Sequence, residues 1–419
     1  LSQTREEPKG EAADWAAMGV GLFPVLNAGQ SLVVQNLHLT GTANLSVGDR
    51  ATNETPVFHG GYQRTMVGAG MLAGALVNGQ AGANITIQNV TASGSVVTNA
   101  LMAGGLIGYC GSPVTTINGA AFRKPASITV KNCNANGVTV KASSIFGGFI
   151  GFGYANAITI EGCKASDITL AATGPQNNGV YWNSANNQSV TNGVGGIIGT
   201  VYQAMLNIEN VSLSTLSLNN SSMDGNLRVG FGGIVGSLVA SGDGSLSNIT
   251  MEGTLQILGT GHASIGGLIG LLTAASNNTQ ASLFGISNIQ IATEAASSLN
   301  QRGYYNGGII GNLDGKIQLT IGGESISEDG TKNIFPVKIG NAETPNVTIS
   351  KGTNNENGIN SGVLGTTSNN PPALTIQHLH LAGVTVNDAA LTSLLFAGGY
   401  GTTAITLKNS EFVSCKLQK

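Results

Sequence analysis

The chain predicts an all-β fold: a right-handed parallel β-helix of about nine coils, with three short strands in each coil. Three observations lead to this expectation. A glycine-rich signal returns along the chain, a strand-like segment follows most of its copies, and an asparagine ends most of those segments. Recurrence at such intervals is typical of solenoids, in which each repeat is one unit stacked on its neighbours.

The recurring signal consists of two small residues, two apolar residues and a glycine. Its clear copies are 104–108, 147–151, 195–199, 232–236, 266–270 and 307–311, with looser copies at 361–365 and 398–401 and a degenerate one at 71–74. We interpret the signal as one strand of each coil. Adjacent residues of a strand face opposite sides, so Leu106 and Ile107 should form one inner and one outer apolar row. Loops or a partner subunit should then cover the outer row.

Two further strands per coil follow the signal. In the first, apolar and polar residues alternate, as in a strand with one buried face; examples are 84–89, 127–132, 157–162, 206–210, 374–378 and 404–409. The second is shorter, as at 138–140, 168–170, 216–218, 255–257 and 384–386. An asparagine ladder is expected at the corner between them, because asparagine tolerates left-handed backbone angles. Its predicted members are Asn89, Asn132, Asn210, Asn248, Asn288 and Asn409, with His378 in the equivalent position.

The ends of a strand stack need protection, because an open strand edge invites aggregation. We expect residues 1–30 to form an N-terminal cap and residues 31–419 to form the β-helix. Within the cap, residues 11–18 predict a short helix with Trp15 over the first coil. The charged segment 411–419 is expected to protect the other end.

Composition excludes several classes of protein. Only 9% of the 419 residues are charged and the formal net charge is −3, so there is no basic field for nucleic acid. The 62 glycines follow no Gly-X-Y period, which excludes collagen. The most apolar run, residues 66–77, is too short to span a membrane. The four cysteines and five histidines show no metal-ligand spacing, so we predict neither a metal nor a cofactor.

Two pairs of residues share a repeat position. Cys133 and Cys163 should be stacked neighbours; buried free thiols are the preferred interpretation, and a disulfide is the alternative in an exported protein. Glu161 and Glu209 should be neighbours on an outward face, with Lys131 one coil earlier. A surface charge ladder is preferred for them over a catalytic carboxylate pair, because no third acidic row accompanies them.

Aromatic residues are concentrated in the segments between the second strand and the next glycine signal. We interpret these segments, 48–65, 171–192 and 297–306, as loops that emerge on one side of the stack. Aromatic rings next to amide and guanidinium groups suit a carbohydrate or protein ligand. The candidate ligand-binding residues are Tyr181, Trp182, Arg302, Tyr304 and Tyr305. The competing interpretation is that the rings only fasten the loops to the wall of the stack.

The Gly-Gly-Leu-Ile-Gly copies resemble the GLUG motif, which recurs in large bacterial surface and secreted proteins, including adhesins and a group of IgA-cleaving peptidases. The resemblance covers residues 66–419. It implies export and a role at the extracellular or outer-membrane surface of a Gram-negative bacterium, with a lipid anchor as one means of attachment. The peptidases are zinc enzymes. This chain has no His-Glu-x-x-His, so protease activity is not carried over.

The sequence therefore predicts a non-catalytic surface or adhesion protein whose partner is a glycan or a host or bacterial surface protein. Two alternatives remain open. One is a polysaccharide-active lyase or hydrolase on a β-helix scaffold, since such folds also carry enzymes. The other is a structural spacer that holds another domain away from the cell.

Overall fold

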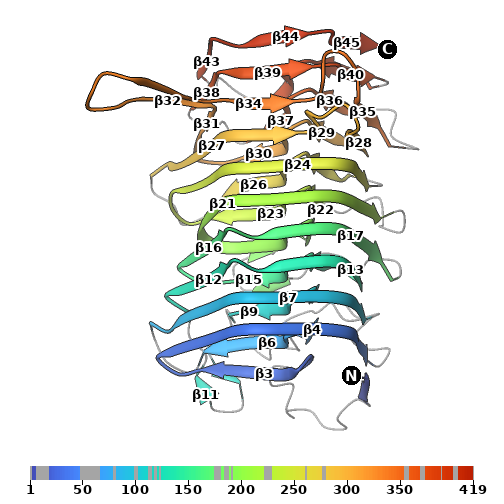
Figure 1. The fold of residues 1–419 in the computed structure, drawn as a ribbon, viewed down its shortest axis with the longest axis vertical. Coiled ribbons are helices and arrows are strands. Elements are labelled where there is room, and N and C mark those ends of the chain that lie inside the picture. Colours follow the sequence, from blue (N-terminus) through green and yellow to red (C-terminus); the bar gives the residue numbers. More distant parts are fainter. Residues whose placement is uncertain are drawn as a thin grey trace.

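A computed structural model describes residues 2–5, 18–47, 67–78, 82–98, 102–111, 116–117, 120–121, 124–173, 181–183, 188–189, 192–220, 229–259, 262–275, 280–352, 358–368, 373–387, 389–399 and 404–418. These residues form an all-β structure of large parallel sheets, elongated along one axis, with strands stacked from the N-terminal to the C-terminal end (Figure 1). None of the described residues is helical. Accordingly, no helix in these ranges is long and apolar enough to cross a membrane.

One sheet is a single ladder of ten short parallel strands, each paired with the equivalent strand of the next layer. In order they are β2 (Met18–Val20), β5 (Val67–Gly70), β8 (Met102–Gly104), β14 (Ile145–Gly147), β20 (Asn192–Gly195), β22 (Val229–Gly232), β25 (Ser264–Gly266), β29 (Tyr305–Gly307), β36 (Ile359–Ser361) and β41 (Leu391–Ser393).

The remaining parallel strands belong to a 29-stranded sheet. Its first ladder follows the ten-stranded sheet along the chain: β3 (Phe23–Ala28), β6 (Ala73–Asn78), β9 (Ile107–Cys110), β15 (Ile150–Gly153), β21 (Ile198–Asn220), β23 (Val235–Ala240), β26 (Ile269–Ala274), β30 (Ile310–Asp314), β37 (Leu364–Ser368) and β42 (Phe396–Gly399). Its second ladder contains β4 (Ser31–Val47), β7 (Asn84–Thr98), β12 (Ser127–Lys131), β16 (Ala157–Glu161), β21, β24 (Gly244–Gly259), β27 (Ser282–Ile291), β31 (Ile317–Ile321), β38 (Ala373–Gln377) and β43 (Ala404–Lys408).

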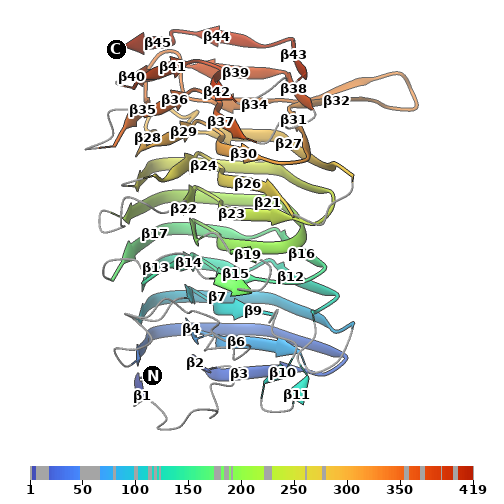
Figure 2. The same ribbon diagram turned by 180° about the vertical axis from the view of Figure 1, so that it is seen from behind.

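The other strands complete each layer beyond the asparagine corner. They are β1 (Ser2–Arg5), β13 (Asn134–Ala142), β17 (Lys164–Ala172), β28 (Ser298–Gly303), β34 (Val337–Ile339), β35 (Val347–Lys351), β39 (Leu379–Ala382), β40 (Val384–Asn387), β44 (Glu411–Val413) and β45 (Lys416–Gln418). Three antiparallel hairpins stand outside the ladders: β10 (Thr116–Ile117) with β11 (Ala120–Ala121), β18 (Tyr181–Asn183) with β19 (Gln188–Ser189), and β32 (Gly323–Ile326) with β33 (Lys332–Phe335). The last of these projects from the body, as the view from behind also shows (Figure 2).

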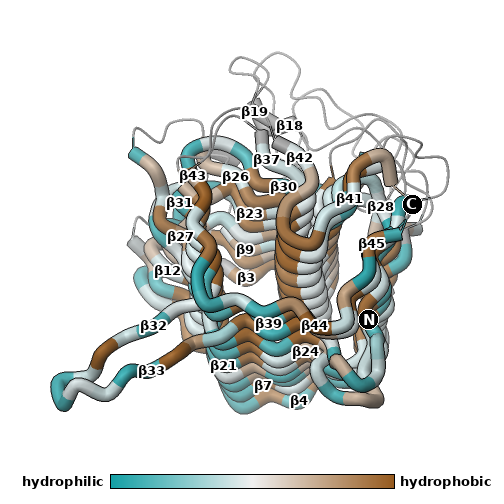
Figure 3. Tube along the Cα trace, turned by 90° about the horizontal axis from the view of Figure 1, so that it is seen from above, coloured by the Kyte–Doolittle hydropathy of each residue, from teal (hydrophilic) through white to brown (hydrophobic). Residues whose placement is uncertain are grey.

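In-register pairing places equivalent side chains in rows along the long axis. Viewed along that axis, the backbone of successive layers shows residues of similar hydropathy one behind another (Figure 3). One row contains Val34, Ile87, Val130, Ile160, Ile208, Leu246, Ile286, Ile321, Ile376 and Leu407. From Ile87 to Ile376 every member is buried, so the core is continuous through the stack.

The glycine signal forms a corner between two sheets, which the sequence did not predict. In each clear copy, one strand belongs to the ten-stranded sheet and the following strand belongs to the 29-stranded sheet. Two residues bend the chain between them, as Gly105 and Leu106 do between β8 and β9. The backbone N–H groups of Leu106 and Ile107 both donate to the carbonyl of Phe149 in the next layer, each at 2.9 Å. Both side chains are fully buried in the same core. The expectation of one inner and one outer row was therefore wrong, because a corner separates the two residues.

Close backbone contact between layers explains why the corner needs glycine. A Cβ atom added to Gly105 would press against the carbonyl oxygen of Gly148, and one on Gly148 would press against that of Gly196. The same relation continues from Gly196 to Gly233 and from Gly267 to Gly308. Any side chain at this position would push adjacent layers apart.

The structure corrects the limits of the repeat. The copy assigned to 71–74 begins one residue earlier, since Gly70 pairs with Gly104. Gly398 and Gly399 lie in β42, opposite Thr366 and Thr367, and the last corner is formed around 393–396 instead. A further layer begins at Met18, whose strand β2 pairs with β5. The predicted capping helix over 11–18 was therefore wrong at Met18, and its other residues lie outside the described ranges.

The asparagine corner is confirmed. Asn89, Asn132, Asn210, Asn248, Asn288 and Asn409 all have φ between 47° and 55°, and His378 has φ 51°. Gly162 and Gly322 occupy the same corner in other layers with positive φ. Side-chain amides of this corner bond along the axis: Asn89 Nδ2 donates to Asn36 Oδ1 at 3.1 Å, and Asn288 Nδ2 donates to Asn248 Oδ1 at 2.6 Å.

The C-terminal segment continues the sheets instead of covering them, contrary to expectation. Strands β44 and β45 pair with β39 and β40 as part of the last layer. Residues that stand in core rows are exposed there, including Ile405 (51%), Leu407 (46%) and Leu417 (52%).

Candidate functional site

Of the five predicted ligand-binding residues, three are placed with their side chains. Arg302 lies on β28, Tyr305 lies on β29, and Tyr304 is the residue between these strands. The interpretation of 297–306 as a loop was wrong, because Leu299, Gln301 and Gly303 alternate inward and β28 pairs with β24 and β35. The other two residues, Tyr181 and Trp182, lie on β18, whose side chains are outside the described part of the molecule.

Tyr304 and Tyr305 form an aromatic cluster with His262 of the preceding layer. The rings of Tyr304 and Tyr305 meet edge to face, with centroids 4.5 Å apart and an interplanar angle of 89°. His262 lies 4.6 Å from the Tyr304 ring at 55°. Such geometries are those that aromatic quadrupoles favour. Parallel pairing makes this cluster, since Ser264 is opposite Tyr305 and the N–H groups of both tyrosines donate to Ala263 O at 3.2 and 3.0 Å.

The aromatic cluster continues as an apolar row on the outward side of the ten-stranded sheet. Tyr305 is opposite Ile359, and Ile359 is opposite Leu391. Tyr304, Tyr305 and Ile359 are partly exposed, and Leu391 is 49% exposed. We call His262, Tyr304, Tyr305, Ile359 and Leu391 the aromatic patch. It spans four successive layers, so its length is about 14 Å at the ordinary strand spacing.

A buried amide supports the patch from inside. Asn306, directly after Tyr305, is fully buried and occupies the core row that holds Phe231 and Ile265 in the two layers before it. Its Nδ2 lies 3.0 Å from Gly303 O, 3.0 Å from Ser350 O and 2.6 Å from Asn360 Oδ1. These contacts join β28, β35 and β36 beneath the tyrosines. The backbone that carries the rings is thus held on both sides, which fixes their positions before any ligand binds.

A second aromatic cluster consists of the buried Tyr202 and the partly buried Tyr154. Tyr154 and Tyr202 have ring centroids 6.1 Å apart, and Lys124 Nζ lies 4.8 Å from the centre of the Tyr154 ring. Burial lowers the pKa of Lys124 and raises the pKa values of Tyr154 and Tyr202 above their ordinary range. Tyr202 is only 4% exposed, so these rings join layers and offer little surface to a ligand.

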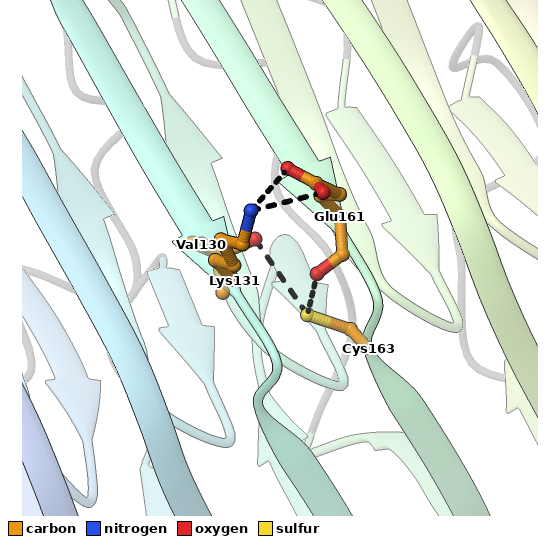
Figure 4. Close-up of polar contacts among 4 residues, drawn as sticks. All are labelled: Val130, Lys131, Glu161 and Cys163. Carbon is orange, nitrogen blue, oxygen red and sulfur yellow. Dashed lines mark hydrogen bonds and ion pairs between the residues drawn. The ribbon is translucent and has the colours of Figure 1, made fainter.

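The predicted carboxylate neighbours are confirmed as neighbours: Glu161 is opposite Glu209, and Lys131 is opposite Glu161. Lys131 Nζ contacts both Glu161 oxygens at 3.0 and 3.1 Å (Figure 4). Glu209 accepts a hydrogen bond of 3.3 Å from Asn248 Nδ2. Glu161 and Lys131 remain 38% and 43% exposed, so this ion pair adds little to stability.

The predicted stacking of Cys133 and Cys163 is confirmed, and both are buried free thiols. The backbone N–H of Cys133 lies 3.4 Å from Cys163 Sγ, which also contacts the carbonyls of Val130 and Glu161 (Figure 4). The hydrogen bond with Cys133, together with burial, raises the pKa of the Cys163 thiol, and burial raises that of Cys110. Cys110, Cys133 and Cys163 are fully buried, so reagents in solution cannot reach them and they should be inert in the folded protein.

Thiol labelling tests this arrangement. The folded protein should take up at most one equivalent of N-ethylmaleimide, at the half-buried Cys415, and the unfolded protein should take up four. Peptide mass spectrometry identifies the labelled residue. Rapid labelling of Cys133 or Cys163 under native conditions would contradict the burial of this pair, and two equivalents in the unfolded protein would show that the pair is oxidised.

In the described ranges no group of three or more His, Cys, Asp or Glu side chains is arranged to hold a metal ion. His262 was missed in the sequence because it is isolated there, and only the pairing of β25 with β29 brings it to Tyr304. No protein-family model, curated protein or solved structure matches this chain.

Proposed function

We propose that the chain is a right-handed parallel β-helix of the GLUG-repeat type, exported to the surface of a Gram-negative bacterium, which binds a glycan or a surface protein without catalysis. Parallel strands in register, sharp corners and a continuous core support the β-helix. We assign right-handed winding because connections between parallel strands of one sheet are strongly biased towards right-handed crossovers. The ten-stranded sheet supports ten coils, one more than the sequence predicts.

The observation that carries the binding function is the aromatic patch. Two tyrosine rings and an imidazole lie together on the outward side of a rigid sheet, and the exposed Arg302 is two residues before Tyr304. Rings of this kind supply flat apolar area for sugar faces, while hydroxyl, imidazole and guanidinium groups supply directed hydrogen bonds. A soluble glycan is the ligand class that this combination favours.

The alternatives have weaker support. A hydrolase or lyase would use Glu161 and Glu209, but each is already bonded to a neighbour on an open strand surface. A spacer would need no preformed aromatic patch. Release of reducing or unsaturated sugar ends, abolished by Glu161→Gln, would favour the enzyme over the binding protein.

Replacing Tyr304 and Tyr305 together by alanine should weaken glycan binding at least about tenfold, because each ring supplies about 1 kcal/mol or more of contact energy. A glycan array would identify the ligand and calorimetry would measure its affinity. Leu283→Ala is the matched control, since Leu283 is 51% exposed and lies elsewhere on the stack. The array should also test the double alanine variant at Tyr181 and Trp182. Unchanged affinity in the Tyr304/Tyr305 variant would refute the patch as the binding site.

A further inference from the structure

The most prominent surface feature without a role in glycan binding is the hairpin arm, residues 323–335, formed by β32 and β33 (Figures 1 and 2). It leaves the stack after Gly322, a corner position, and returns before β34. Every residue from 324 to 335 is exposed. A two-stranded hairpin is marginally stable alone in water, so an arm of this kind gains from further pairing.

One face of the arm carries the most exposed isoleucine of the described chain. Glu324 is opposite Ile334 and Ile326 is opposite Lys332, so these four side chains share a face. Ile326 is 76% exposed and Ile334 is 51% exposed. Leaving them in water forgoes the stabilisation that burial would bring, about 1.5 to 3 kcal/mol for each side chain. The same face therefore has an apolar surface suited to a partner.

Polar contacts hold the arm in a fixed direction. At its base, Glu324 Oε2 contacts Lys332 Nζ at 2.8 Å and His378 Nε2 at 2.7 Å. At its tip, the Ser327 N–H donates to Thr331 O at 2.8 Å, and Asn333 Nδ2 donates to Ser327 Oγ at 2.7 Å. An arm fixed in this way loses little conformational entropy when it pairs.

The hydrogen bond between Ser327 and Thr331 determines which backbone N–H and C=O groups of the arm point away from the hairpin. In an antiparallel pair, residues that bond across the hairpin alternate with residues whose N–H and C=O point away. Since Ser327 bonds to Thr331, the pair of Ser325 and Asn333 also bonds inward. The backbone groups of Lys332 and Ile334 consequently point outward and form an open strand edge.

We propose that the arm is a dimerisation element, in which β33 pairs antiparallel with β33 of a second copy about a two-fold axis. Three registers centred on β33 keep facing residues on the same face of the joint sheet. One centred on Lys332 would set two like charges opposite each other, and one centred on Ile334 would need an N–H from Pro336. The register centred on Asn333 avoids both, and it places Lys332 opposite Ile334 of the second copy. Lys332 and Ile334 then exchange backbone hydrogen bonds across the axis, and the four isoleucines gather on one face of a four-stranded sheet. The contact is self-complementary, as a two-fold interface requires.

Charge complementarity favours a second copy of this chain as the partner of the arm. The tip carries Glu328 and Asp329, whereas Lys338 is exposed on β34, just after the arm returns to the body. Antiparallel pairing centred on Asn333 brings the acidic tip of each arm beside Lys338 of the other copy. Thirteen residues from each arm form a contact below the size of standard stable interfaces, so the dimer should be weak, with a Kd in about the micromolar range.

Sedimentation equilibrium from about 1 to 200 µM tests the proposal directly. The wild-type protein should shift from the mass of one chain towards that of two. The double change of Ile326 and Ile334 to serine should raise the dimer Kd at least about tenfold. Leu283→Ser is the control and should dimerise like wild type, because Leu283 is as exposed as Ile334 but lies on the body. Wild-type protein that stays monomeric, or a double variant that dimerises normally, would overturn the proposal.

Cysteine cross-linking tests the register. In a non-hydrogen-bonded antiparallel pair the Cα atoms are about 4.5 Å apart, within the range that a disulfide needs. Asn333→Cys should therefore form a disulfide-linked dimer with oxidised glutathione, which takes up the two electrons and is released as two thiols. Ser325→Cys, on the other strand of the arm, should not form a disulfide-linked dimer. Wild-type protein is the control for cross-linking through the partly exposed Cys415. Equal cross-linking at both positions would contradict pairing through β33. Neither measurement involves a glycan, so its result is independent of the proposed function.

Discussion

Gly148→Ala is expected to destabilise the protein by more than about 3 kcal/mol, or to prevent folding. The new Cβ would press against the carbonyl oxygen of Gly196, which is backbone of the next layer and cannot rotate away. The layers would have to separate at the corner, where Phe149 N and Ile150 N both bond to Ile197 O. The midpoint of urea unfolding, followed by circular dichroism, measures the effect.

Gly285→Ala is the matched control. A Cβ at Gly285 has no neighbour within 4 Å, and its row carries Ser245 and Thr320 in the flanking layers. We expect a small gain in stability, because alanine restricts the unfolded chain more than glycine does. Similar unfolding midpoints for the two variants would contradict the proposed role of glycine at the corner.

Asn306→Asp should destabilise the protein about as much as Gly148→Ala, although it replaces only an amide NH2 group by an oxygen. The amide nitrogen that faces Gly303 O, Ser350 O and Asn360 Oδ1 would become a carboxylate oxygen facing three acceptors in the buried interior. Burying an unpaired charge costs several kcal/mol, or forces the group to take up a proton. Local unfolding would also displace Tyr304 and Tyr305, so glycan affinity should fall together with stability.

The pH dependence of this variant has a defined sign. Burial and acceptor neighbours raise the folded-state pKa of the new carboxyl above its unfolded value of about 3.9. Its stability should therefore approach wild type below about pH 4 and decrease as pH rises through the folded pKa. Thermal unfolding from acid to neutral pH measures this, with the exposed Asn300→Asp as control. A stability difference from wild type that does not change with pH would contradict a buried charge at this position.

Local chemistry made part of the fold predictable. Asparagine at this corner in most layers predicts a left-handed backbone angle, and alternating apolar residues such as Ile158 and Ile160 predict a buried face. The glycine corner was harder to predict, because the clash that requires glycine involves the next layer, which no single repeat reveals. For the same reason the layer that turns at 20–23 was missed, and the corner at 393–396 was assigned to 398–401 instead.

The aromatic patch was only partly predictable. Tyr304 and Tyr305 stand out as aromatic residues in a chain poor in them, but His262 joins them only through parallel pairing of layers. The hairpin arm left a clear signal that the sequence interpretation overlooked. Asp329-Gly330 is a typical hairpin turn, flanked here by Ile326 and by Ile334, and Gly330 adopts φ 83°.

The direction of the hydrogen bonds has a mechanical consequence for the proposed role at a cell surface. Neighbouring layers are joined by bonds parallel to the long axis, so tension along that axis loads the layers in series and the weakest one opens first. Residues that face each other in adjacent layers are 30 residues apart in the chain at Lys131 and Glu161, and 53 residues apart at Gln35 and Gln88. Each opened layer would thus release roughly 100 to 190 Å of extended chain. Such a molecule would lengthen in steps under load, which would limit the peak force on a ligand bound at the proposed site.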